Sequence, residues 1–208
     1  MPAPVNIGQV LGNAAVFNFS RHRSNQSFAS AADIPTEVEA FFNLLDERGV
    51  DYVLVGGLAM LAHLPGRNTE DLDLIVSLSD QDRLAPTELR VDFLETEHAL
   101  FAQVAREFSE ARLFDFFSAP RTIRCATPTG LLVLKLYALP SLYRQGQISR
   151  AKIYEGDIGR LVNAFPEIEL EKIFTLLPGH GMLPSDVEEL RRVVSEQKPR
   201  PDRFGSAS

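Results

Sequence analysis

Several features are scarce or missing in this 208-residue chain, and each absence excludes a class of protein. A single cysteine, Cys125, excludes a disulfide scaffold and a cysteine-rich zinc or iron–sulfur site. The longest apolar run, 131–139, is broken by Lys135 and is far shorter than the roughly 20 residues that span a bilayer. The N-terminus has no basic segment followed by an apolar stretch, so we expect no signal peptide, no membrane association and a cytoplasmic location.

Basic charge is also scarce. The chain has 21 Lys and Arg against 28 Asp and Glu, which gives a net charge of −7. It therefore offers no general positive field for the phosphates of duplex nucleic acid, and a nucleic-acid partner would need a local basic groove. The four histidines lack metal-ligand spacing, and no Gly-x-Ser-x-Gly or zincin motif is present. With 45% hydrophobic residues, the chain can bury a substantial core.

The order of apolar patterns predicts an α/β or α+β fold, with a small mixed sheet early in the chain and a helical second half. We expect an unstructured arm (1–32), a core that contains the sheet (33–126), a helical part (127–198) and a flexible tail (199–208).

Hydrophobic periodicity and turn residues locate the individual elements. Asp33 is expected to cap the first helix and Gly49 to end it in the left-handed conformation. The other helices are expected at 58–64, 99–112, 129–139, 151–165, 168–177 and 185–195. Strands are expected at 52–55, 72–78 and 90–94, with a further hairpin or edge strands at 113–117 and 122–126.

Paired acids at Asp71 and Asp73 give the chain its clearest chemical signal. Alternate residues of a strand share a face, so both point one way while Leu72 and Leu74 point into the core. Two adjacent carboxylates repel unless a cation lies between them, and Mg²⁺ binds carboxylate oxygens together with water and phosphate. The alternative is two solvated acids at the end of a strand.

A third acid, Asp92, lies between apolar residues on the next predicted strand. Three carboxylates on neighbouring strands form the usual two-metal arrangement for phosphoryl transfer. We therefore expect two Mg²⁺ ions, which Mn²⁺ could replace. Asp115, in Leu113-Phe-Asp-Phe-Phe117, has the same local pattern and is the competing candidate, although Asp92 is preferred.

Residues suited to phosphate lie just ahead of these acids. Gly56 and Gly57 join a strand to a helix, where missing side chains let backbone N–H groups approach a phosphate. They match neither the dinucleotide fingerprint nor the P-loop. Arg67 offers a planar fork and Thr69 a hydroxyl donor. Alternatively, Gly56-Gly57 could be a plain turn and Arg67 a loop arginine in solvent.

Lys135 interrupts the apolar face of its predicted helix, because its neighbours on both adjacent turns are apolar. A buried lysine is costly unless an anion pairs with it, and phosphate or Asp157 would meet that need. The alternatives are that Lys135 snorkels along the helix and that Asp157 is a surface acid beside Arg160.

Taken together, these motifs resemble the signature of the nucleotidyltransferases related to DNA polymerase beta. The resemblance rests on Gly56-Gly57, thirteen intervening residues and Asp71-x-Asp73. The run Arg67-x-Thr-x-Asp-Leu-Asp-Leu74 is especially similar to small bacterial members, which include the abortive-infection type toxins of toxin–antitoxin pairs.

Later matches extend the resemblance to about Leu161. Arg124 to Ala138 is similar to the family's segment leading to a lysine on an apolar helix, and Asp157-Ile-Gly-Arg-Leu161 to its later Asp-Ile-x-x-Leu. Two features depart from the family pattern. The run before Asp157, beginning at Lys152, lacks the usual basic–acidic pair and second Asp, and the link from Asp73 to Asp92 is short.

The resemblance implies a metal-dependent enzyme with its catalytic core in residues 33–126. It would move a nucleoside monophosphate from an NTP to a hydroxyl of an RNA, such as tRNA, or of a protein, and could have an antitoxin protein as partner. The implied metal ligands are Asp71, Asp73 and Asp92. The implied substrate-binding residues are Gly56, Gly57, Arg67 and Thr69. Lys135 and Asp157 would complete the catalytic set, as they do in toxin-type members.

Two other hypotheses remain open. The chain could be a nucleotidyltransferase-like module that keeps the fold without turnover and acts as a binding or regulatory protein. Alternatively, its acids could form a simple structural Ca²⁺ or Mg²⁺ site.

Overall fold

The computed structural model describes residues 5–6, 34–64, 72–81, 84, 91–115 and 119–197. The chain divides into two compact units, one ending at Thr127 and the other beginning at Pro128. No helix in these described segments combines the length and hydropathy needed to cross a membrane.

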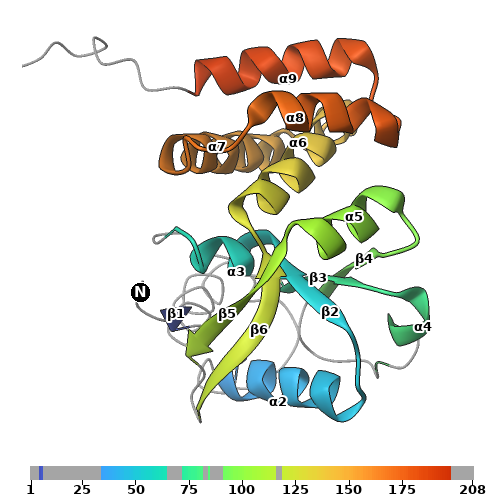
Figure 1. The fold of residues 1–208 in the computed structure, drawn as a ribbon, viewed down its shortest axis with the longest axis vertical. Helices are drawn as coiled ribbons and strands as arrows, with labels where there is room; N and C mark the ends of the chain where they lie inside the picture. Colours follow the sequence, from blue (N-terminus) through green and yellow to red (C-terminus); the bar gives the residue numbers. More distant parts are fainter. Residues whose placement is uncertain are drawn as a thin grey trace, which may run out of the picture. The chain divides into compact units, whose positions relative to one another are not determined.

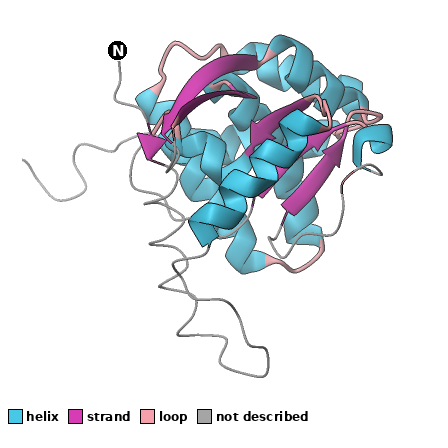
Figure 2. Ribbon diagram, turned by 90° about the horizontal axis from the view of Figure 1, so that it is seen from below, coloured by secondary structure: helices cyan, strands magenta, loops and turns pink. Residues whose placement is uncertain are grey.

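The first unit is built on one mixed sheet, whose strands are magenta in Figure 2. In the described residues it has six strands in the order β1-β5-β6-β2-β3-β4 (Figure 1). The strands are β1 (Val5–Asn6), β2 (Tyr52–Val55), β3 (Leu72–Val76), β4 (Val91–Glu95), β5 (Ser109–Asp115) and β6 (Pro120–Ala126). The pairs β2–β3 and β5–β6 are antiparallel, and β1–β5, β2–β6 and β3–β4 are parallel. The predicted mixed sheet is therefore confirmed.

Apolar runs explain the central strands. Val53, Leu54 and Val55 of β2 are buried, and so are four of the five residues of β3. Such runs are typical of strands covered on both faces. The helices of this unit are α2 (Ile34–Glu47), α3 (Gly56–Leu61), α4 (Leu78–Gln81) and α5 (Ala99–Glu107).

One face of α2 packs on the core. This face consists of Val38, Phe41, Phe42 and Leu45, which are all buried, and the centre of the Phe42 ring lies 5.7 Å from that of Tyr52 on β2. Gly49 follows the helix with φ +59°, the left-handed conformation that its type predicts. The expected cap, Asp33, lies outside the described residues.

The helix expected at 99–112 is shorter, ending at Glu107, and β5 begins at Ser109 instead of residue 113. Leu100, Val104 and Phe108 have helical spacing, but the side chains alternate after Phe108: Leu113 is exposed and Phe114 is buried. Seven residues of β5 pair with β6 in a hairpin, and this pairing overrides the local helical pattern.

Two further elements differ from the prediction. The strand expected to reach Leu78 stops at Val76, because Ser77 accepts a hydrogen bond from the Asp80 backbone N–H (3.1 Å) and caps α4. Within the arm predicted to be unstructured, Val5 and Asn6 form β1 and pair with β5, which supplies partners for backbone groups at the edge of the sheet. The rest of residues 1–32 lies outside the described part of the chain.

The second unit is helical, as the sequence predicts (Figure 1). Its helices are α6 (Pro128–Arg144), α7 (Ile148–Ala164), α8 (Leu170–Leu176), the 3₁₀ helix η1 (Leu177–His180) and α9 (Pro184–Glu196). The sequence predicts that α6 ends at Leu139, before Pro140, but it continues to Arg144. Proline costs about 3 kcal/mol inside a helix, and burial of Leu142 on the added turn offsets part of that cost.

Candidate functional site

Two of the predicted acids are brought together on neighbouring strands. In the parallel pair β3–β4, Asp73 lies directly beside Asp92. Paired residues of adjacent strands point to the same face, and the strands are about 4.8 Å apart. Both acids are partly exposed, whereas Leu72 and Leu74 on either side of Asp73 are buried. The sheet therefore places these two acids side by side.

The same strand order resolves the choice between Asp92 and Asp115. Asp115 ends β5, and β6 and β2 separate β5 from β3. Three strand spacings amount to roughly 14 Å, so Asp115 is remote from Asp73. Asp92 is the acid beside Asp73, and Asp115 was the wrong alternative for that position.

A glycine lies against the carboxylate of Asp73. Val55, the last residue of β2, pairs with Asp73, and Gly56 follows it with φ +64°. A β-carbon built on Gly56 would overlap the Asp73 carboxylate and lie 2.8 Å from the Asp73 Cβ. The first glycine of the Gly-Gly pair therefore contacts the acid directly. Gly57 is buried in α3.

The other predicted residues of this region, Arg67, Thr69 and Asp71, lie outside the described residues. Among the residues that are described, no three His, Cys, Asp or Glu side chains are grouped closely enough to hold a metal ion. Asp73 and Asp92 are among these residues and Asp71 is not, so the predicted trio stays a prediction.

Lys135 and Asp157 form a buried ion pair in the second unit. Lys135 Nζ on α6 lies 2.7 Å from Asp157 Oδ2 on α7, and the two side chains are only 5% and 6% exposed. Of the two anions expected for the lysine, the structure supplies Asp157. The alternatives of a snorkelling lysine and a surface aspartate are wrong, because both side chains are buried.

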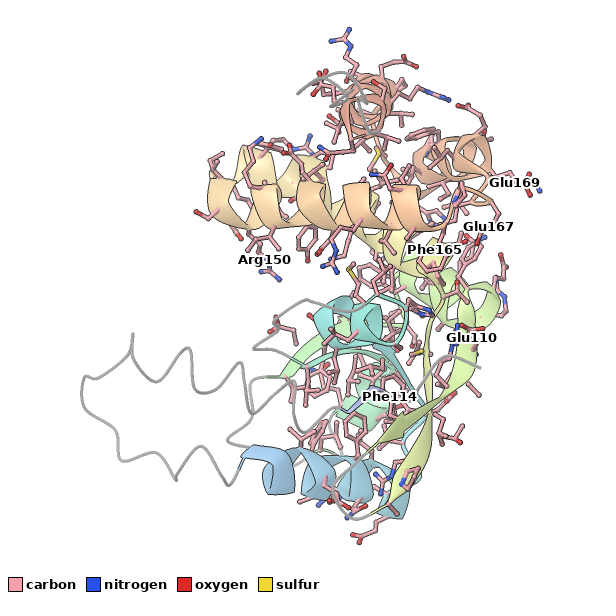
Figure 3. The ribbon with its side chains drawn as sticks, turned by 90° about the vertical axis from the view of Figure 1, so that its left-hand side faces the viewer. Glu110, Phe114, Arg150, Phe165, Glu167 and Glu169 are labelled. Atoms are coloured by element: carbon pink, nitrogen blue, oxygen red, sulfur yellow. The ribbon has the colours of Figure 1, made fainter. Side chains whose placement is uncertain are left out.

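Tyr154 completes this cluster. Lys135 Nζ lies 4.3 Å from the centre of the Tyr154 ring, within the range of a cation–π interaction. Tyr154 and Asp157 are three residues apart on α7 and so share a face of the helix. Arg150, labelled near the start of α7 in Figure 3, also approaches this ring: its Cζ lies 5.9 Å from the ring centre. The lysine thus links α6 to α7 through both a carboxylate and a ring.

His63 has well-defined contacts that the spacing of the histidines did not reveal. Its Nε2–H donates to the carbonyl oxygen of Ala126 (2.8 Å), and Nδ1 accepts from Arg112 Nη2 (3.4 Å). Glu110, labelled on β5 in Figure 3, holds Arg112 through Nε at 2.8 Å. Burial lowers the pKa of His63, and the arginine beside Nδ1 also opposes a second proton.

Acidification is therefore expected to destabilise the first unit through His63. Its pKa is lowered from 6.5 in the folded chain, so below pH 6.5 the unfolded chain takes up a proton that the folded chain resists. Above pH 6.5 both states are neutral there and the contribution is constant. His63→Gln should reduce the loss of stability between pH 7 and pH 5 by at most about 1.4 kcal/mol per pH unit.

Urea denaturation at several pH values measures this difference. His180→Gln, in the second unit, controls for the loss of a histidine. An unchanged pH dependence in His63→Gln would show that the buried ring is protonated equally in both states.

Cys125, on β6, has the core position expected of it. It is fully buried, and burial raises the pKa of its thiol to about 12. The thiol therefore stays protonated at neutral pH, as is typical of a buried structural cysteine.

Comparison with known proteins gives similarity at the level of solved structures. No family model matches the chain, and no curated protein matches it. Among solved structures, the chain is similar to one described as an antigenic nucleotidyltransferase-like protein from Paracoccidioides brasiliensis. The TM-score is 0.46 and the identity 16%, over 77% of this chain and 94% of the other.

Proposed function

We propose that the first unit is a metal-dependent nucleotidyltransferase that transfers a nucleoside monophosphate from an NTP to a hydroxyl group and releases pyrophosphate. The observation that supports this most directly is the pairing of Asp73 with Asp92 on adjacent parallel strands, beside the glycine turn at Gly56. The motif that contains Asp71 and Asp73 supplies the resemblance to the nucleotidyltransferases.

The two acids suit a hard divalent cation. Aligned carboxylates about one strand spacing apart repel each other, and a cation between them removes that repulsion. Mg²⁺ favours such oxygen ligands together with water and phosphate oxygens. When bound, it would stabilise the negative charge that develops on the transferring phosphate. Asp71, the first acid of the Asp-x-Asp motif, would be the third ligand.

The remaining roles follow the chemistry of the side chains. Asp92 would accept hydrogen bonds from the acceptor hydroxyl and help to activate it. Backbone N–H groups of Gly56 and Gly57, with the Thr69 hydroxyl, would bind the triphosphate, and Arg67 would neutralise its charge. The acceptor, an RNA or a protein, and the partnership with an antitoxin also belong to this proposal.

The active-site role of Lys135 and Asp157, which the resemblance implies, remains a prediction. Each already has the other as a charged partner at 2.7 Å in the second unit. A triphosphate would have to compete with the Asp157 carboxylate for the lysine. The sequestered pair favours a second candidate, a nucleotide-binding module without turnover.

Labelled NTPs test the proposal. Purified full-length chain, Mg²⁺ and each NTP labelled on its α-phosphate are incubated with total tRNA or with a cell-protein extract. We expect label to enter one acceptor class, pyrophosphate to be released, and EDTA or Asp71→Ala to abolish both. Labelling that persists in Asp71→Ala would remove the assignment. NTP binding in calorimetry that is indifferent to Mg²⁺, with no labelling, would favour the inactive module.

A further inference from the structure

We infer that Gly56 is a positioning residue: its missing side chain is the space in which the Asp73 carboxylate lies. The role of Asp73 as a metal ligand rests on the proposed function, whereas the steric contact between positions 56 and 73 does not. A β-carbon at position 56 would overlap that carboxylate and lie 2.8 Å from the Asp73 Cβ. Non-bonded carbon atoms are in optimal contact at about 3.5–4.0 Å, so any larger residue displaces Asp73.

Rotation of the Asp73 side chain cannot fully relieve this overlap. Its Cβ, which does not move when the side chain rotates about χ1, is already within 2.8 Å. The backbone is held as well, because Val55 pairs with Asp73 and the next pair, Leu54 with Leu74, is fully buried. A larger residue at position 56 must therefore shift both the carboxylate and the strand that aligns Asp73 with Asp92.

Gly49 separates this effect from the ordinary need for glycine in a turn. Both glycines have a left-handed backbone, with φ +59° at Gly49 and φ +64° at Gly56. A β-carbon on Gly49 meets nothing within 4 Å, whereas one on Gly56 meets Asp73. Gly49→Ala thus carries the backbone cost alone, and Gly56→Ala carries the backbone cost and the overlap.

Metal binding distinguishes a positioning role from a merely structural one. Binding of Mn²⁺ to the full-length wild type, Gly49→Ala and Gly56→Ala is measured by electron paramagnetic resonance. We expect wild-type affinity in Gly49→Ala and a Kd raised roughly tenfold or more in Gly56→Ala, the loss typical when a ligand's support is removed. Equal affinity in the two variants would overturn the positioning role.

A second measurement covers the cases in which Gly56→Ala is unstable or the wild type does not bind Mn²⁺. Thermal unfolding is compared for Gly56→Ala in the wild-type and Asp73→Gly backgrounds, because Asp73→Gly removes the three atoms nearest to the added β-carbon. We expect Gly56→Ala to lower the midpoint more than Gly49→Ala does, and this excess to disappear with Asp73→Gly. An excess that persists would overturn the contact. Failure of the wild type to bind Mn²⁺, with the excess abolished, would count against the proposed function alone.

Discussion

Asp73→Asn is expected to lower the rate of nucleotidyl transfer by roughly 10³-fold, because loss of a bound cation removes several kcal/mol of transition-state stabilisation. The amide has nearly the same shape as the carboxylate and fits beside Gly56, but it lacks the charge that attracts Mg²⁺. Asp92→Asn should have an effect of similar size, since Asp92 lies beside Asp73 in the sheet. Initial rates at saturating Mg²⁺ and NTP measure both.

Glu95→Gln is the matched control for these two substitutions. Glu95 lies on the same strand as Asp92, three residues further along, and is exposed. Its neutralisation should leave the rate within about twofold. A rate in Asp73→Asn close to that of Glu95→Gln would show that catalysis does not depend on this carboxylate. Circular dichroism of all three variants excludes unfolding as the cause of a lost rate.

Lys135→Met is expected to destabilise the second unit by about 3–5 kcal/mol, because it leaves the Asp157 carboxylate buried without its cation. The cation–π contact with Tyr154 is lost at the same time. Replacing both members of the pair, in Lys135→Met/Asp157→Leu, should recover most of the loss, since two apolar side chains need no charged partner. Urea denaturation of the full chain, followed by circular dichroism, measures these changes.

An exposed ion pair of the same length provides the control. Lys172 Nζ lies 2.7 Å from Glu169 Oε1, but these side chains are 76% and 66% exposed. Lys172→Met should therefore change the free energy of unfolding by less than about 1 kcal/mol. Similar losses in Lys135→Met and Lys172→Met would show that burial does not govern the strength of the first pair. A double variant as unstable as Lys135→Met would show that the unpaired Asp157 carboxylate does not cause the loss of stability.

Elements set by local patterns could be predicted from the sequence. The buried face of α2, the apolar strand β2 and the left-handed Gly49 all follow from residue type and spacing within a few positions. Lys135 was also identifiable as a lysine in need of an anion, because its helical neighbours are apolar.

Elements that depend on a strand partner could not be predicted in the same way. The pattern around Phe108 fits a helix as well as a strand, and only pairing with β6 selects β5 there. Val5 and Asn6 carry no strand signal of their own, yet they pair with β5 at the edge of the sheet. Strand pairing depends on a partner outside the segment itself, so the periodicity within one segment contains no record of it.

The same distinction between local pattern and tertiary contact applies to the candidate site. The sequence alone determined which residue types are present: the Asp-x-Asp run, the Gly-Gly turn and two similar third acids, Asp92 and Asp115. Only the tertiary structure decided that Asp92 lies beside Asp73, that Gly56 contacts the same carboxylate, and that Asp157 is the anion for Lys135. The reason is that residue type and spacing fix the chemistry and the face of each side chain, whereas the order of strands and the packing of helices fix its neighbours.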